Sequence, residues 1–213
     1  MKKFRLVVLS VSLLVALVIG PLAALAQDGT GYKTFSTDDG LVTFSHPEDW
    51  FVEADEKGNI NIANSEAVLD AVQEKGFVPA EGDILISLLF VPTAYSDLLG
   101  VHGETLEDKV TGLRDLMVEF NQDLGPERVV VAGDVVLSEA ENQAAIAQVT
   151  YSQGTTTNGI LAIWQTPQDF VGVAILVTST GNAAAQEEAL HTILRSVEFS
   201  VTFAEILEQY SAE

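Results

Sequence analysis

The sequence contains no cysteine among its 213 residues. A disulfide framework, a zinc site built from thiolates and a thiol nucleophile are therefore excluded. Because no cysteine follows the apolar N-terminal run, attachment of a lipid at a mature N-terminus is excluded as well. The protein is not expected to be a lipoprotein.

Positive charge is also scarce, since 10 Lys and Arg stand against 31 Asp and Glu and the formal net charge is −21. A surface potential of this sign repels phosphate backbones and anionic lipid. Nucleic acid is therefore not expected as a partner, and electrostatic binding to a membrane surface is not expected either. Basic proteins and cations are the partners that such a charge favours.

Recognisable catalytic motifs are missing too. The three histidines, His46, His102 and His191, do not stand at a metal-ligand spacing. There is no G-x-S-x-G elbow, no H-E-x-x-H helix and no phosphate-binding glycine loop. We assign no catalytic, cofactor-binding or metal-ligating residue and do not expect an enzyme. The acids between Glu48 and Glu56 fit exposed turns and strand faces better than a glycosidase pair.

Calcium is the one cation that the sequence leaves open. The segments DEKGN (55–59) and STDDG (36–40) are oxygen-rich and contain glycine, but neither has the spaced pattern of a calcium-binding loop. We therefore expect no cofactor, with weak calcium binding as the alternative.

The N-terminus has the three parts of a secretory signal peptide. A basic start, MKKFR, precedes an apolar run, and Ala24 and Ala26 give the small-x-small pattern before a cut at Gln27. The run is also about as long as the ~20 residues of a spanning helix, so an uncleaved anchor is the alternative. Cleavage removes Lys2, Lys3 and Arg5 and changes the formal net charge from −21 to −24. The predicted location is extracytoplasmic: periplasmic, cell-surface or secreted, with no membrane span after cleavage.

The rest of the chain is long enough for one core. We predict a signal peptide over 1–26, a flexible leader over 27–34, a single domain over 35–203 and an acidic tail over 204–213. No repeat and no interdomain linker is visible in the sequence.

Alternating apolar residues predict short strands at the start of the domain. LVTFS (41–45) and WFVEA (50–54) alternate with a period of two, and HPED (46–49) between them predicts a hairpin turn that His46 opens. A second turn, DEKGN, leads to NINIA (59–63). Trp50, Ile60 and Ile62 are expected to face the core, and most of the acids are expected to face water.

Helical spacing follows in three places. One helix is predicted from Glu66 to about Lys75, and one starts near Asn182 with Ala189, Leu190, Ile193 and Leu194 facing the core. In the middle of the chain, Thr105 and Asp108 resemble a capping box before a helix. The apolar stripe of that helix is predicted to be Leu106, Val110, Leu113, Met117, Phe120 and Leu124.

Strand patterns fill the remaining segments. DILISLLFV (83–91) is apolar on both faces, which predicts a central strand. Four β-runs, at 128–137, 144–152, 159–165 and 171–179, are separated by turn-rich pieces, and VEFSVTF (197–203) alternates once more. Trp164 lies inside one of these runs and is expected in the core. Together these patterns predict an α+β fold with one largely antiparallel sheet and helices packed on its faces.

Several segments, taken in order, resemble the PsbP-like, Mog-type superfamily. They are GLVTFSHPEDW, the small hairpin after it, the amphipathic middle helix, the consecutive hairpin strands and ILRSVEF, and they span Phe35 to Phe203. The family usually has glycine before the tryptophan, where this chain has Asp49. The resemblance implies an α/β/α sandwich. Members include extrinsic PsbP proteins of photosystem II, a Ran-binding import factor and bacterial envelope proteins, mostly binding or assembly factors. No PsbP metal or photosystem-docking motif is present, so no photosynthetic role is implied.

Three functional hypotheses follow. The first is an exported, non-catalytic binding or assembly domain whose partner is another envelope or extracellular protein. The second is a carboxylate- or cation-assisted extracytoplasmic hydrolase, which requires histidine, serine or acidic side chains to converge in a deep pocket. The third is a carrier that holds an apolar ligand between sheet and helix.

Overall fold

The structure is a computed structural model that describes residues 31–55, 58–72, 79–123, 129–137, 144–153, 155–179 and 183–211. The predicted signal peptide, residues 1–26, lies outside these ranges. No helix within them combines the length and the hydropathy that crossing a membrane requires.

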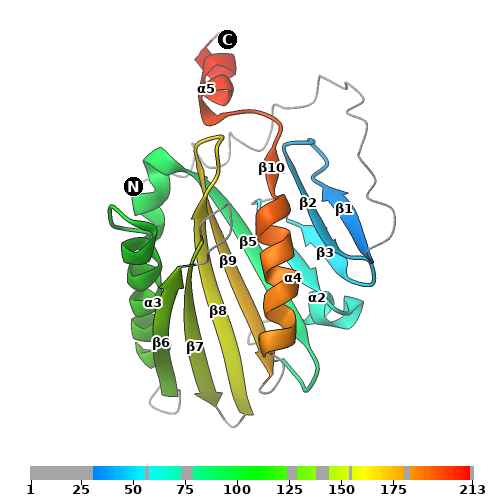
Figure 1. The fold of residues 1–213 in the computed structure, drawn as a ribbon, viewed down its shortest axis with the longest axis vertical. Coiled ribbons are helices and arrows are strands. Elements are labelled where there is room, and N and C mark those ends of the chain that lie inside the picture. The colour runs from blue at the N-terminus through cyan, green and yellow to red at the C-terminus, as the bar shows by residue number, and fades with distance from the viewer. Residues whose placement is uncertain are drawn as a thin grey trace.

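Seven antiparallel strands form the large sheet, in the order β3-β4-β5-β9-β8-β7-β6 (Figure 1). The strand β5 lies between β4 and β9, which confirms the central strand predicted from its apolar sequence. Most of the turn-rich piece between the predicted β-runs 144–152 and 159–165 instead lengthens these two strands. Gln153 pairs with Thr155, and threonine suits strands. The bounds are β3 Phe51–Ala54, β4 Ile60–Ala63, β5 Ile84–Pro92, β6 Val129–Leu137, β7 Ala144–Gln153, β8 Thr155–Gln165 and β9 Phe170–Ser179.

A second, three-stranded sheet corrects the expectation of a single sheet. It contains β1 (Tyr32–Ser36), β2 (Val42–Pro47) and β10 (Glu198–Phe199) in the order β1-β2-β10. The turn predicted at HPED is present, with the Trp50 N–H donating to the Pro47 carbonyl at 3.1 Å. It does not close a hairpin, however. Because β2 has a partner on each side, the chain leaves the small sheet there and enters the large one as β3.

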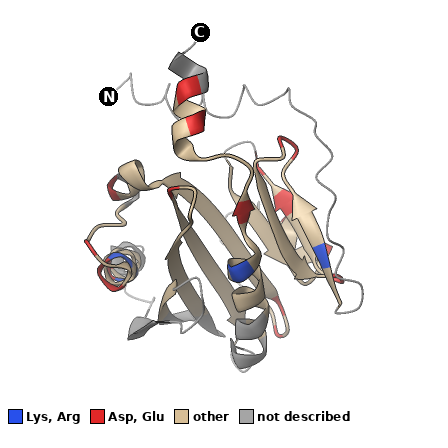
Figure 2. Cartoon of the chain, turned by 45° about the horizontal axis from the view of Figure 1, so that its top comes forward, with Lys and Arg blue, Asp and Glu red and all other residues tan. Residues whose placement is uncertain are grey.

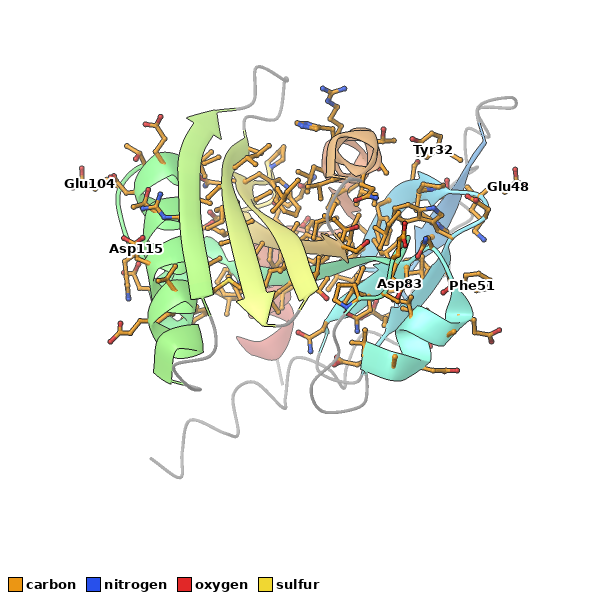
Figure 3. The ribbon with its side chains drawn as sticks, turned by 90° about the horizontal axis from the view of Figure 1, so that it is seen from below. Tyr32, Glu48, Phe51, Asp83, Glu104 and Asp115 are labelled. Carbon is orange, nitrogen blue, oxygen red and sulfur yellow. The ribbon has the colours of Figure 1, made fainter. Side chains whose placement is uncertain are left out.

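Helices cover both faces of the large sheet, which confirms the α+β fold. On one face, α4 (Ala183–Ser196) and the small sheet lie side by side over a core that includes Ile62, Ile86 and Trp164. On the other face, α3 (Leu106–Asp123) packs over Leu161 and Val173, and α2 (Glu66–Val72) packs over Ala63 and Leu85 (Figure 3). The order of layers is helix, sheet, helix.

The predicted helical stripes agree with the structure where it describes them. In α4, Ala189, Leu190, Ile193 and Leu194 are all buried. In α3, Val110 and Leu113 are buried and Leu106 and Met117 pack beside them, whereas the Phe120 side chain and Leu124 lie outside the described residues.

The capping box before α3 is also present. The Asp108 N–H donates to Thr105 Oγ1 at 3.1 Å, and the Thr105 N–H donates back to Asp108 Oδ2 at 3.1 Å. Each of the two residues thus satisfies one backbone donor of the first turn.

Both ends of the predicted domain require correction. Tyr32, Lys33 and Thr34, expected in the flexible leader, belong to β1, where the ring of Phe35 packs 5.2 Å from that of Phe44. At the other end, the expected acidic tail forms a helix, α5 (Phe203–Ser211). A second capping box starts this helix, because the Thr202 N–H donates to Glu205 Oε2 at 2.7 Å and the Glu205 N–H donates to Thr202 Oγ1 at 3.3 Å.

Candidate functional site

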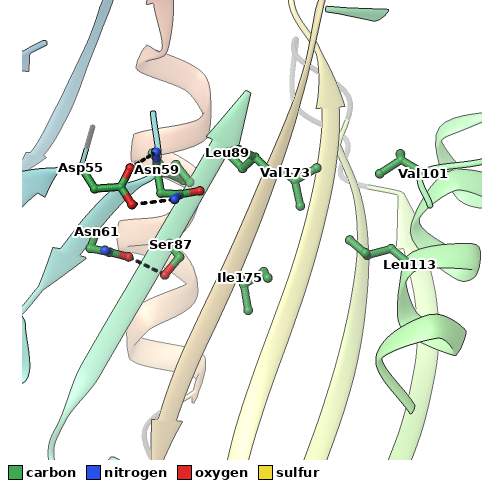
Figure 4. A pocket seen from close by; sticks show the side chains of 10 residues that line it. Asp55, Asn59, Asn61, Ser87, Leu89, Val101, Leu113, Val173 and Ile175 are labelled. Carbon is green, nitrogen blue, oxygen red and sulfur yellow. Dashed lines mark hydrogen bonds between the residues drawn. The ribbon is translucent and has the colours of Figure 1, made fainter. Parts of the chain in front are cut away.

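A groove of about 350 Å³ lies on the face of the large sheet that carries α2 and α3. The helix α2 packs over β3, β4 and the start of β5, and α3 packs over β6, β7 and β8. The sheet surface between the two helices is therefore open, and Figure 4 shows the side chains along it. The lining residues are Asp55, Asn59, Asn61, Ser87, Leu88, Leu89, Val101, Leu113, Val173 and Ile175.

The pairing of the strands arranges these side chains in rows. In one row, Asn61 of β4 pairs with Ser87 of β5, and Ser87 pairs with Ile175 of β9. Glu53 of the edge strand β3 pairs with Asn61 and extends the row outward. Paired residues of antiparallel strands point to the same face of a sheet. Polarity along the row therefore changes from carboxylate through amide and hydroxyl to an aliphatic side chain.

Hydrogen bonds fix the polar end of the groove. Gly58, with a φ of 84°, supplies the left-handed residue that the β3–β4 hairpin turn requires. The turn places Asn59 beside Asp55, so that its backbone N–H donates to Asp55 Oδ1 at 2.9 Å and its Nδ2 donates to Asp55 Oδ2 at 2.7 Å. Nearby, Ser87 Oγ donates to Asn61 Oδ1 at 2.7 Å (Figure 4).

Aliphatic side chains form the other end. Leu89 and Val173 are a cross-strand pair on the floor, next to Ile175. Val101, from the loop before α3, and Leu113, from the middle of α3, form the wall. The groove is open to solvent on one side and combines an apolar floor with a polar edge, a pattern typical of binding sites.

Acidic and basic residues both lie on the elements that border the groove. The Lys and Arg residues in the described ranges are Lys33 on β1, Lys109 and Arg114 on α3 and Arg195 on α4, and Figure 2 colours the Lys and Arg positions of the ribbon blue. None of these four is among the residues that line the groove. The Arg114 guanidinium lies 2.9 Å from the Asp115 carboxylate. Asp55 in the lining and Glu53 beside it place two acidic residues at the polar end of the groove.

His46 comes directly before the turn predicted at HPED. It also continues the inward face of β2 after Val42 and Phe44, and only 2% of it is exposed, which the turn prediction did not include. Burial, with a smaller effect from the Lys33 ammonium group, lowers the pKa of His46 to about 4. Its Nδ1 is buried without a hydrogen-bond partner. The side chain is therefore a neutral part of the core.

The remaining candidate residues do not converge either. His102 is exposed, with Nδ1 3.7 Å from Asp97 Oδ1, and His191 is half-buried on α4. Glu48 and Asp49 are exposed at the turn after β2, and Glu56 lies outside the described residues. Asp55 and Ser87 line the groove, but no histidine is among its lining residues.

The two loops considered for calcium are held by internal hydrogen bonds. In STDDG, Asp39 Oδ1 accepts from Thr37 Oγ1 at 2.6 Å and from the Leu41 N–H at 2.9 Å. In DEKGN, Asp55 accepts from Asn59 as described above. No group of three or more potential metal ligands occurs in the part of the chain that the structure describes. Weak calcium binding stays a prediction.

The two tryptophans lie in the core, and the two carboxyl groups with lowered pKa values lie at the starts of helices. Trp50 and Trp164 are both buried, as expected from their strand patterns. Hydrogen bonds from the Thr105 hydroxyl and backbone lower the pKa of Asp108, and hydrogen bonds from the Thr202 backbone and hydroxyl lower that of Glu205. Both carboxylates belong to capping boxes and lie outside the groove lining.

Asn61 and Ser87 are the groove residues that sequence reasoning missed. Each is a polar residue inside an otherwise apolar strand, in NINIA and in ILISLLFV. A polar residue at such a position suggests that its face of the strand is not covered. That signal could have identified the open part of the sheet, although not the helices at its borders.

Comparisons with known proteins show a likeness of fold only. No family model matches the chain, and no curated protein matches it. Among solved structures, the chain is similar to cyanobacterial PsbP (CyanoP) from Synechocystis. The two are 12% identical with a TM-score of 0.47, and the match covers 84% of this chain and 99% of CyanoP. The Ran-binding protein Mog1p of Saccharomyces cerevisiae is 12% identical with a TM-score of 0.49, and the match covers 81% of this chain and 97% of Mog1p. LpqN of Mycobacterium tuberculosis, described as involved in cell envelope biogenesis, has 13% identity, 78% and 88% coverage and a TM-score of 0.43.

Proposed function

We propose that the protein is an exported, non-catalytic binding domain of the cell envelope, and that it holds a segment of a partner protein in the groove between α2 and α3. The N-terminal signal pattern supports export. The groove supports binding, and it is the observation that carries the proposal, because an apolar floor bordered by fixed hydrogen-bonding groups is left open between two helices.

The open side of the groove favours a chain segment over a small molecule. A small-molecule pocket encloses about 70–90% of its ligand, which a trough open to solvent cannot do. A segment that belongs to a larger partner needs only one of its sides buried. Its apolar side chains fit over Leu89, Val173 and Ile175, and its backbone or polar groups lie within the reach of Asn59, Asn61 and Ser87.

Affinity capture from the envelope fraction of the source cells tests this function when it is combined with a groove-filling variant. Ser87→Phe places a ring over the groove floor, and Ser36→Phe adds the same ring to an exposed position of β1 in the other sheet. The expected result is one protein captured by the wild type and by Ser36→Phe but lost with Ser87→Phe. A charge-matched acidic protein serves as the bait control.

Equal capture by the wild type and Ser87→Phe contradicts the proposal, and so does the absence of any protein specific to the bait. Near-UV circular dichroism establishes that each variant is folded. If Ser87→Phe does not fold, Asn61→Phe fills the neighbouring position of the same row. An apolar small molecule that co-purifies with the protein and is lost with Ser87→Phe would favour the carrier function instead.

A further inference from the structure

We propose that Asn61 positions the partner segment by donating a hydrogen bond from its side-chain Nδ2 to a backbone carbonyl of the segment. The groove then recognises an extended main chain at Asn61 and apolar side chains over its floor. This inference rests on the proposed function of the groove, and it adds the atom of this protein that fixes the segment in place.

The Asn61 amide has unused donors. Its Oδ1 accepts from Ser87 Oγ at 2.7 Å (Figure 4), whereas its Nδ2 takes part in no hydrogen bond within the part of the chain that the structure describes. Nor is Nδ2 enclosed, because the buried side-chain atoms without a partner in the described residues belong to His46, Thr93, Gln168 and Gln186. An amide nitrogen carries two N–H donors, so both can reach a ligand in the groove.

Ser87 holds this amide in one orientation. Asn61 and Ser87 are cross-strand partners on β4 and β5, and the hydroxyl that donates to Oδ1 fixes which end of the planar amide faces Ser87. Nδ2 is bonded to the same carbon as Oδ1, so it is directed away from that hydroxyl. A donor that is already oriented loses little conformational freedom when a ligand binds.

The other lining side chains offer fewer donors. Asn59 already donates from Nδ2 to Asp55 Oδ2 at 2.7 Å, and Ser87 uses its hydroxyl proton on Asn61. The remaining described lining residues are aliphatic: Leu88, Leu89, Val101, Leu113, Val173 and Ile175. A carbonyl brought against this surface loses its water and needs a donor. Among the described lining residues, Asn61 is the one whose side-chain amide keeps both N–H groups unused.

The position of Asn61 beside the apolar floor favours a backbone acceptor over a side-chain acceptor. Ser87 pairs with Asn61 on one side and with Ile175 on the other. Neighbouring strands are about 4.8 Å apart, so Ile175 lies about 10 Å from Asn61. An extended segment presents a carbonyl on each of its sides about every 7 Å. A segment that covers Ile175 with an apolar side chain therefore brings a carbonyl within reach of Asn61, whatever residue stands there.

Selection of phage-displayed random dodecapeptides against the purified protein supplies the probes. Peptides that bind the wild type but not Ser87→Phe are directed to the groove. Their affinities are then measured for Asn61→Asp, which keeps an oxygen for the Ser87 hydroxyl but has no N–H donor. Gln165→Glu is the matched control, because it also replaces an amide by a carboxylate, at an exposed position of β8 outside the groove lining.

An ester scan identifies the acceptor. Each peptide bond of a groove-directed peptide is replaced in turn by an ester, whose carbonyl accepts hydrogen bonds more weakly and which has no N–H. The loss of the N–H affects binding to the wild type and to Asn61→Asp alike, so it cancels in the ratio of the two affinities. Only the carbonyl that accepts from Asn61 changes this ratio.

Asn61→Asp is expected to weaken the binding of groove-directed peptides about three- to tenfold, as the loss of one hydrogen bond predicts. Gln165→Glu is expected to leave their affinity unchanged. One ester position is expected to weaken binding to the wild type about threefold more than binding to Asn61→Asp.

The outcomes separate the two proposals. If no selected peptide depends on Ser87, both the groove function and the inference are wrong. If groove-directed peptides bind Asn61→Asp as tightly as the wild type, lose as much affinity with Gln165→Glu, or show no ester position that changes the ratio, the groove function stands and the inference is wrong. If Ser87→Phe does not fold, Ile175→Phe defines the groove-directed peptides, and if Asn61→Asp does not fold, Asn61→Ala takes its place.

Discussion

Gly172 of β9 lies directly against the indole ring of Trp164 on β8. The two residues are a cross-strand pair, and a Cβ added at Gly172 would come within 2.4 Å of Trp164 Cε2 and Cζ2. Trp164 also packs edge-on against Phe90, with ring centroids 5.8 Å apart. The absence of a side chain at position 172 is therefore what lets the largest buried side chain of the core lie flat against the sheet.

Gly172→Ala is expected to destabilise the protein by about 1–3 kcal/mol, because the added methyl group forces the indole out of its position. Gly112 on α3 provides the control, since the nearest atoms to a Cβ there are 3.8 Å away. Gly112→Ala is expected to stabilise the helix by about 0.5–1 kcal/mol. Urea denaturation measures both changes, and the prediction fails if the two substitutions have the same sign.

Stability is expected to fall between about pH 6.5 and pH 4 because of His46. The pKa of His46 is about 4 in the folded protein and 6.5 in the unfolded chain, so in this window the unfolded chain binds a proton that the folded protein does not. The contribution of His46 is therefore complete above pH 6.5 and is lost as the pH falls through about 4, by about 3 kcal/mol in total.

Urea denaturation at several pH values measures this dependence, and His46→Leu is its control. The variant is expected to have a nearly flat profile between pH 5 and 6.5, because it has no imidazole to protonate. The lowered carboxyl pKa values of Asp108 and Glu205 act at more acidic pH. An identical slope in the wild type and His46→Leu would show that other groups carry the dependence.

Thr105→Ala is expected to lower the free energy of unfolding by about 1 kcal/mol. It removes the hydroxyl that accepts from the Asp108 N–H at 3.1 Å and leaves a donor of the first turn of α3 without its cap. Thr105→Ser keeps the hydroxyl and is expected to stay within a few tenths of a kcal/mol of the wild type. Thermal or chemical denaturation of the three proteins gives the comparison, and a loss of equal size in both variants would exclude capping as the cause.

The exported protein is expected to begin at Gln27. Mass spectrometry of the intact protein recovered from outside the cytoplasm identifies the terminus, and replacing Ala24 and Ala26 by leucine is expected to leave the precursor uncut, because the small-x-small pattern is lost. Retention of Met1 in the wild-type protein would instead support the anchor.

Local patterns in the sequence were sufficient for the elements and for much of the core. Period-two alternation identified Ile60 and Ile62 as buried, and helical spacing identified Leu190 and Ile193. The same alternation that buries Val42 and Phe44 also reaches His46, two residues further on, so its burial could have been predicted by extending the strand through the turn signal at Pro47.

The same patterns could not predict which strands pair when they are far apart in the sequence. Alternation shows that a strand has an inward face, but it does not show which strand lies beside it. The turn at HPED has the chemistry of a hairpin, yet β2 pairs with β10. Alternation predicted a strand at 197–203, but it did not show that β2 would be its neighbour. The groove depends on such pairing as well, because Asn61, Ser87 and Ile175 become neighbours only through the order β4-β5-β9.

The pairing of β2 with β10 joins nearly the first strand of the chain to its last. The Ser45 N–H donates to Ser196 Oγ at 2.8 Å across 151 residues of sequence. During synthesis, β2 emerges long before its second neighbour exists, and the apolar side chains of Val42 and Phe44 have no α4 to pack against until almost the whole chain has been made. The small sheet is therefore complete only when the chain includes β10, and a chain that ends before Glu198 leaves one edge of β2 without its partner strand.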